Sequence, residues 1–141
     1  MICRIEVEGA DRCGKDTLVG YLDYMSNRQI PVSSRGLLST LVYNDIYNRF
    51  MSTERQKEMI DGNKETLIVL LYGYSDDIKL RCKITHEPEI DVIRDMNTFY
   101  EYGLKLQEQG LKVLFYNTSE KTPYEIAKDV INKIQNDKEE I

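Results

Sequence analysis

Residues 2–17, ICRIEVEGADRCGKDT, decide the fold of this chain. Apolar and charged residues alternate over residues 2–7, as in a strand with one buried face, and the alternation stops at Gly9, where the chain can turn sharply. After the turn, apolar residues recur at the i, i+4, i+7 spacing of an amphipathic helix over residues 15–25. The stretch therefore predicts a strand, a glycine-rich turn and a helix, in that order.

The turn matches the G-x-x-x-x-G-K part of the phosphate-binding loop pattern. Glycines let backbone N–H groups close around a β-phosphate, the following helix adds the positive end of its dipole, and Lys15 bridges the oxygens of the transferred phosphoryl group. An ordinary strand-to-helix turn with a surface lysine is the alternative, which the flanking strand and helix disfavour. The predicted ATP-binding residues in this loop are Gly9, Ala10, Asp11, Arg12, Cys13, Gly14, Lys15, Asp16 and Thr17.

The rest of the chain alternates strands and helices. Apolar stretches predict further strands at residues 29–32, 66–71 and 111–116. Helical spacing and capping residues predict helices at residues 36–50, 52–60, 75–83 and 89–109, and from Pro123 to a charged, frayed tail at 136–141. This order predicts one α/β domain over residues 1–141, with a doubly wound parallel sheet of four to five strands flanked by helices. Ligands bind such sheets at the carboxyl ends of the strands, where residues 9–15 are expected.

Composition narrows the function classes. The 141 residues carry a net charge of −5, which argues against a broad nucleic-acid surface. Cys3, Cys13 and Cys82 lack the spacing of a zinc site and the even count of a disulfide framework. No apolar run approaches the roughly 20 residues of a membrane span, and the amino terminus lacks a signal peptide. We therefore expect a cytoplasmic protein with no membrane partner; a homodimer is left open.

Asp16 departs from the loop pattern, because a Ser or Thr hydroxyl that binds magnesium usually occupies this position. The carboxylate could meet magnesium directly or through water, with the ion held mainly by nucleotide phosphates. Equally, Asp16 could be a negative charge that the helix dipole favours. Both interpretations stay open from the sequence.

Residues 8–17, EGADRCGKDT, resemble the opening of thymidylate kinases, which belong to the P-loop nucleoside triphosphate hydrolase and kinase fold. The resemblance implies that Asp11 contacts the 3′-hydroxyl of the acceptor sugar and that Arg12 stabilises charge on the moving phosphoryl group. Residues 34–43 resemble the Asp-Arg motif of this family, which makes Arg35 the arginine that grips the acceptor phosphate. Ser34 replaces the Asp of that motif.

Weaker resemblances follow along the chain. Residues 80–83 look like the LID of nucleotide kinases, so Arg81 and Lys83 would approach the ATP phosphates; cations favoured at a helix carboxyl end are the alternative. Residues 94–100 resemble the segment in which Arg94 and Tyr100 would help hold the acceptor, and core packing of the aromatic ring is the alternative. His86 is expected to be a loop residue rather than a base.

These observations predict transfer of the ATP γ-phosphoryl group to a (deoxy)nucleoside monophosphate, which the resemblance specifies as thymidine monophosphate. Lys15, Arg12 and Arg35 would be catalytic with magnesium, since an anionic acceptor needs no general base. The chain is shorter than ordinary thymidylate kinases and similar to compact bacteriophage kinases. A deoxynucleoside kinase, a polynucleotide 5′-kinase and a catalytically inactive nucleotide-binding protein remain alternatives.

Overall fold

The structure, a computed structural model, describes residues 1–10 and 12–139, without the side chains of residues 137–139. The described residues form one four-stranded sheet with the order β2-β1-β3-β4. Its strands are β1 (Arg4–Glu8), β2 (Val32–Ser34), β3 (Thr66–Tyr72) and β4 (Lys112–Asn117), and every neighbouring pair is parallel. The predicted parallel sheet is thus confirmed, at the lower of the two expected strand numbers.

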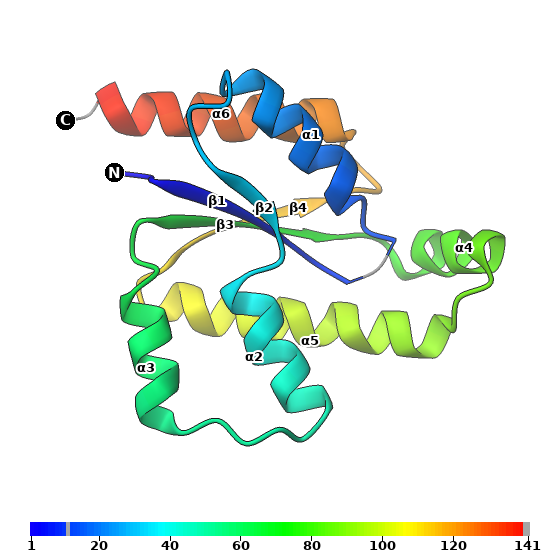
Figure 1. Ribbon diagram of the computed structural model, residues 1–141. Coiled ribbons are helices and arrows are strands. Elements are labelled where there is room, and N and C mark those ends of the chain that lie inside the picture. The colour runs from blue at the N-terminus through cyan, green and yellow to red at the C-terminus, as the bar shows by residue number, and fades with distance from the viewer. Residues whose placement is uncertain (11, 140–141) are drawn as a thin grey trace.

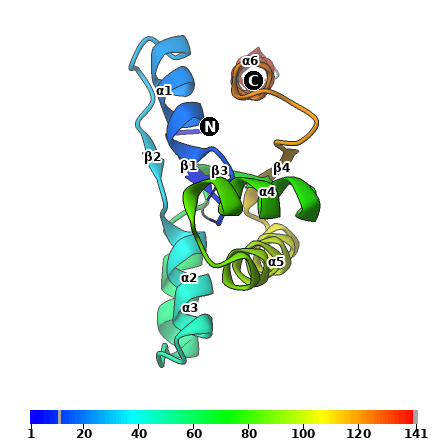
Figure 2. The ribbon, with the colours of Figure 1, turned by 90° about the vertical axis from the view of Figure 1, so that its right-hand side faces the viewer.

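Helices cover both faces of the sheet, as a doubly wound fold requires (Figure 1). The helices α1 (Lys15–Met25) and α6 (Pro123–Glu139) lie on one face. The opposite layer holds α2 (Leu37–Ile46), α3 (Thr53–Asp61) and α5 (Glu89–Glu108). Helix α4 (Ser75–Thr85) lies beyond the carboxyl ends of the strands, beside the loop after β1 (Figures 1 and 2). No helix in the described part of the chain is long and apolar enough to cross a membrane.

The core is centred on β3, whose residues from Thr66 to Leu71 are all buried. A central parallel strand is covered on both faces, which explains its continuous apolar run. Phe99 of α5 and Leu22 of α1, which come from helices on opposite faces of the sheet, are both buried in the same core. Burying such a side chain contributes roughly 1.5–3 kcal/mol, so this sheet is a firm support for the loops at its carboxyl edge.

Three predicted boundaries differ from the structure. The second strand begins at Val32 rather than at residue 29, because Asn27 and Arg28 make a left-handed turn after α1 and Pro31 has no N–H for the ladder. The helix predicted over residues 36–50 ends at Ile46, where Asn48 takes a left-handed conformation. The tail expected to fray from residue 136 is helical to Glu139.

Candidate functional site

The loop between β1 and α1 depends on two glycines. Gly9 has a φ of 146°, and a Cβ there would lie 2.8 Å from the carbonyl oxygen of Leu71 in β3. Gly14 has a φ of 86°, in the left-handed region, and it is the N-cap of α1 with no side-chain cap. The first-turn N–H groups of a helix have no intrahelical partners, so they point toward the loop. The backbone therefore has the form of the anion-binding turn that the motif predicts.

Lys15 is the first residue of α1 and its side chain curls back over the loop. Its Nζ donates hydrogen bonds to the carbonyl oxygens of Gly9, at 2.7 Å, and Ala10, at 3.1 Å. These bonds place the ammonium inside the curve of the loop, where a phosphate bound to the backbone N–H groups would meet it. Cys13 is fully buried beneath the loop, whereas Asp16 and Thr17 are exposed.

Arg12 stands at the tip of the loop with a φ of 67°, an uncommon conformation for a residue other than glycine. Its carbonyl oxygen accepts a hydrogen bond of 2.9 Å from Nη1 of Arg81 in α4. The same Nη1 donates to the hydroxyl of Thr118 after β4, at 3.3 Å. Arg81 therefore links the loop to the segment after β4, and the structure brings Arg81 next to Arg12; the approach of Arg81 to ATP phosphates stays a prediction.

A pocket of about 300 Å³ opens on this loop. Its lining includes three predicted catalytic residues and the two residues, Asp16 and Ser34, that differ from the thymidylate kinase motifs. The full lining is Arg12, Gly14, Lys15, Asp16, Thr17, Ser34 and Arg35. Among the described residues, no group of three or more His, Cys, Asp and Glu side chains could form a metal site. Asp16 thus fits magnesium only as a single carboxylate that supplements phosphate oxygens, which is how magnesium commonly binds.

Arg35 joins this pocket to a second one. It follows β2 with a φ of 72°, its N–H donates to the carbonyl oxygen of Val7 at 2.9 Å, and its guanidinium lies 5.9 Å from the centre of the Tyr43 ring. The second pocket measures about 430 Å³. It is lined by Arg35, Gly36, Ser39, Thr40, Tyr43, Asn44 and Arg49.

The sequence analysis did not identify Arg49, which lines this second pocket. Arg49 follows Asn48, the left-handed residue that ends α2, and its N–H donates to the carbonyl oxygen of Asn44 at 2.7 Å. This cap folds the chain back beside the helix, and the guanidinium of Arg49 lies 5.3 Å from the centre of the Tyr47 ring. The predicted helix over residues 36–50 was therefore wrong at its carboxyl end, because Arg49 lies after α2 and not within it.

Two buried carboxylates of β1 also went unrecognised. Glu6 accepts a hydrogen bond from the Leu37 N–H at 3.1 Å, and Glu8 accepts one from the Ser39 N–H and another from the Ser39 hydroxyl at 2.9 Å. They satisfy the first turn of α2 and complement its dipole. Burial raises the pKa of Glu8 to about 7, although the Ser39 hydrogen bonds oppose the shift. Charged residues within a strand that is covered on both faces were the available signal.

Three predicted residues outside the loop, Lys83, Arg94 and Tyr100, do not line either pocket. Lys83 is exposed, with Nζ 4.0 Å from a carboxylate oxygen of Glu89. Arg94 pairs with Asp91 and Asp95 on its own helix, α5. Tyr100 packs edge-on against Tyr72, with ring centres 5.3 Å apart, and also contacts Phe115. Asp11 lies outside the described residues. Roles for these residues at a nucleotide stay predictions.

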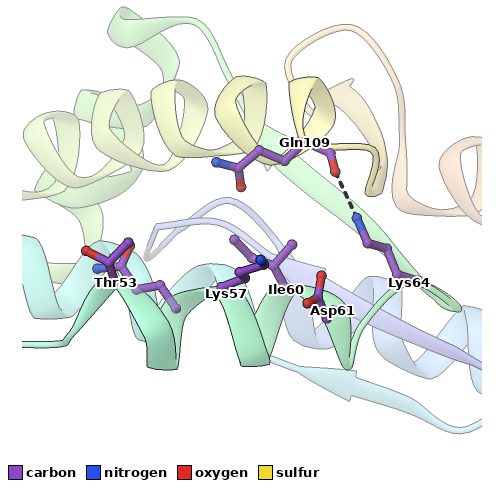
Figure 3. A pocket seen from close by; sticks show the side chains of 7 residues that line it. Thr53, Lys57, Ile60, Asp61, Lys64 and Gln109 are labelled. Carbon is purple, nitrogen blue, oxygen red and sulfur yellow. Dashed lines mark hydrogen bonds between the residues drawn. The ribbon is translucent and has the colours of Figure 1, made fainter.

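A further pocket lies at the opposite edge of the sheet, between α3 and the end of α5 (Figure 3). It measures about 250 Å³. Lys64 crosses it to donate a hydrogen bond of 2.8 Å to the carbonyl oxygen of Gln109. This pocket lies near the amino ends of the strands, whereas parallel sheets bind ligands at the carboxyl ends of their strands.

Comparisons with known proteins show the fold. No protein-family profile matches the chain, and no curated protein resembles it significantly in sequence. The chain is similar to a solved structure of the YorR protein from Bacillus subtilis in complex with phosphorylated GDP. The two share 20% sequence identity and superimpose with a TM-score of 0.77, over 96% of this chain and 97% of YorR. The four-stranded parallel sheet with flanking helices is thus a P-loop kinase-like fold.

Proposed function

We propose that this protein binds Mg–ATP at the loop between β1 and α1 and transfers its γ-phosphoryl group to a nucleotide acceptor. The loop supplies backbone N–H groups and Lys15 for the β- and γ-phosphates. The pocket beside α2 supplies the acceptor site. YorR, which has the same fold, is described in complex with a nucleotide, and this supports a nucleotide as ligand here.

The position of Arg35 carries this proposal. Arg35 lines both the loop pocket and the α2 pocket, so one arginine borders the two places where phosphates would bind. A guanidinium can bind two phosphate oxygens at once, which suits a residue that must hold a donor and an acceptor in line. A simple nucleotide-binding protein has no need of a second arginine-lined pocket at this place.

The chemistry that these residues offer is charge neutralisation and positioning. Lys15 and Arg12 would face the transferred phosphoryl group, and Arg35 with Arg49 would hold an anionic acceptor. Among the residues that the structure describes, which leave out residue 11, Asp16 is the one carboxylate that lines either pocket, so the described lining offers a hydroxyl acceptor no further general base. This favours a nucleoside monophosphate over a nucleoside.

Thymidine monophosphate is the first acceptor to test, because the phosphate-binding loop resembles that of thymidylate kinases. Guanine nucleotides are the second, because the similar YorR structure contains phosphorylated GDP. Magnesium would be held by the ATP phosphates and by Asp16 or its bound water, and would neutralise phosphate charge.

The test is a coupled ADP-release assay with Mg–ATP and a panel of nucleosides, nucleoside monophosphates and 5′-hydroxyl oligonucleotides. We expect turnover with at least one monophosphate and none with the oligonucleotides. Lys15→Ala is the control for contaminating kinases. Release of ADP that persists in Lys15→Ala, or turnover with nucleosides alone, would contradict the proposed reaction.

A catalytically inactive nucleotide-binding protein is the second candidate, favoured by Asp16 and Ser34 in the loop pocket. Both stand where related kinases carry groups linked to the metal. If the parent protein binds ATP but turns over none of the panel, while Asp16→Thr combined with Ser34→Asp gains activity, this candidate replaces the first.

A further inference from the structure

Glu87 lies between α4 and α5, and its backbone is fixed by the way α4 ends. His86 takes the left-handed conformation with a φ of 59°. Its N–H donates to the carbonyl oxygen of Lys83, and the Glu87 N–H donates to that of Cys82 at 2.9 Å. These are the two hydrogen bonds of the Schellman motif, and Pro88 follows directly. The cap therefore holds Glu87 in one place beside the loop.

From this place Glu87 reaches the loop arginine. Its Oε1 accepts hydrogen bonds from Nε of Arg12, at 2.7 Å, and from Nη2 of Arg12. The Arg12 guanidinium lowers the pKa of Glu87, so the carboxylate is charged at neutral pH. Because Arg81 also holds the Arg12 carbonyl, α4 and its cap together restrain both the main chain and the side chain of Arg12.

The ion pair between Arg12 and Glu87 contributes little to the stability of the fold. The side chains of Arg12 and Glu87 are 43% and 23% exposed, and ion pairs this accessible to water typically contribute little to the free energy of unfolding. The second carboxylate oxygen, Oε2, is buried, and no described residue donates a hydrogen bond to it. An unsatisfied oxygen costs roughly as much as such a pair gains. The contact therefore calls for an explanation other than stability.

An explanation is that the Arg12 side chain has to be held in one orientation. Its long side chain starts from an exposed loop tip, so without a partner it would sample many rotamers. Glu87 engages the Nε edge of the guanidinium, which sets the plane in which the rest of the group is presented to the loop pocket. A misplacement of about 1 Å at a reacting centre can cost about 100-fold in rate.

We propose that Glu87 is a positioning residue, which orients the Arg12 guanidinium toward the phosphoryl group that the enzyme transfers. The proposal rests on the proposed function, because it needs Arg12 at the transferred group. It also explains why the residue lies at the junction of α4 and α5: a movement of α4 would shift both the Arg81 and the Glu87 contacts of Arg12 together.

Kinetics of Glu87→Ala and Glu87→Gln test the role of the carboxylate. We expect Glu87→Ala to lower kcat at least about 10-fold with ATP affinity unchanged within about threefold, since orientation rather than ground-state binding is lost. Glu87→Gln keeps an acceptor oxygen, so its kcat should lie between those of the parent and of Glu87→Ala. The melting temperature should barely change. Glu89→Gln is the matched control, because its exposed pair with Lys83, at 4.0 Å, contributes little and its carboxylate also stands at the start of α5.

A double-mutant cycle separates action through Arg12 from any other effect. If Glu87 acts through Arg12, Glu87→Ala should have no further effect on kcat in the Arg12→Ala protein. Additive losses, an unchanged kcat in Glu87→Ala, or an equal loss in Glu89→Gln would each overturn the proposal.

One measurement needs no turnover. The Arg12 Nε–H resonance of ¹⁵N-labelled protein, assigned by its loss in Arg12→Lys, should exchange slowly with water in the parent and quickly in Glu87→Ala, and stay unchanged in Glu89→Gln. If no acceptor is phosphorylated, the proposed function fails, and this resonance alone then decides whether Glu87 orients the Arg12 guanidinium. A resonance that Glu87→Ala leaves unchanged would overturn the proposal even in an active kinase.

Discussion

The loop pocket and the α2 pocket lie side by side, but they are built differently. The loop pocket is shaped by backbone, through two glycines with positive φ and the first turn of α1. The α2 pocket is shaped by side chains of one helix and its cap, and the helix is held at its first turn by Glu6 and Glu8 of β1. A backbone site follows from a short local pattern, whereas a side-chain site depends on how distant elements pack.

Removing the ammonium from the loop pocket should have the largest effect. We expect Lys15→Ala to lower kcat about 100- to 1,000-fold and to weaken ATP binding, because a preorganised charge at the phosphates is lost. Its melting temperature should stay close to that of the parent, since the two hydrogen bonds that Nζ donates to Gly9 and Ala10 join residues of the same loop. Calorimetric ATP titration and circular dichroism melting measure the two; an unchanged ATP affinity would refute the loop assignment.

The support beneath the α2 pocket should make stability depend on pH. Burial raises the pKa of Glu8 from 4.5 to about 7, so the folded protein holds the proton of this carboxyl more tightly than the unfolded chain does. The resulting contribution to the free energy of unfolding is fully present below pH 4.5 and is lost as pH rises through 7. The loss approaches about 3 kcal/mol. Urea unfolding at pH values from 4.5 to 7.5 should show this slope in the parent and a flatter one in Glu8→Gln. Parallel slopes in the two proteins would mean that Glu8 is ionised in the fold without cost.

Arg35, which belongs to both pockets, distinguishes their roles. We expect Arg35→Ala to lower kcat/KM for the acceptor about 30- to 100-fold, because charge-assisted bonds to its phosphate are lost. ATP affinity should change less than about threefold. Steady-state kinetics at saturating ATP measure the first and calorimetry the second. A fall in ATP affinity with unchanged acceptor kinetics would move Arg35 to the donor side of the site.

The smallest effect concerns Asp16, the departure within the loop pocket. If its carboxylate serves magnesium, Asp16→Ala should raise the magnesium concentration for half-maximal rate about threefold, and Asp16→Thr should restore a hydroxyl ligand and keep activity. Magnesium titrations at fixed ATP give both values. Tighter ATP binding with undiminished turnover in both variants would leave Asp16 as a charge that only faces the helix dipole.

The sequence by itself determined the strand, loop and helix of the phosphate-binding turn. The predicted helix over residues 15–25 matches α1, and the apolar run at residues 66–71 is the central strand β3. These elements follow from local rules, namely glycine conformations, helical spacing and burial of a central strand. The parallel sheet with helices on both faces followed from their order along the chain.

Only the tertiary structure decided which side chains gather at the carboxyl edge of the sheet. It brought Arg35 into both pockets, turned Arg49 back beside α2, and placed Glu87 against Arg12 from 75 positions further along the chain. It also placed Lys83, Arg94 and Tyr100 against side chains outside both pockets. Such contacts depend on helix caps and on packing between elements far apart in sequence, and no local periodicity encodes the distance between two side chains that only the fold brings together.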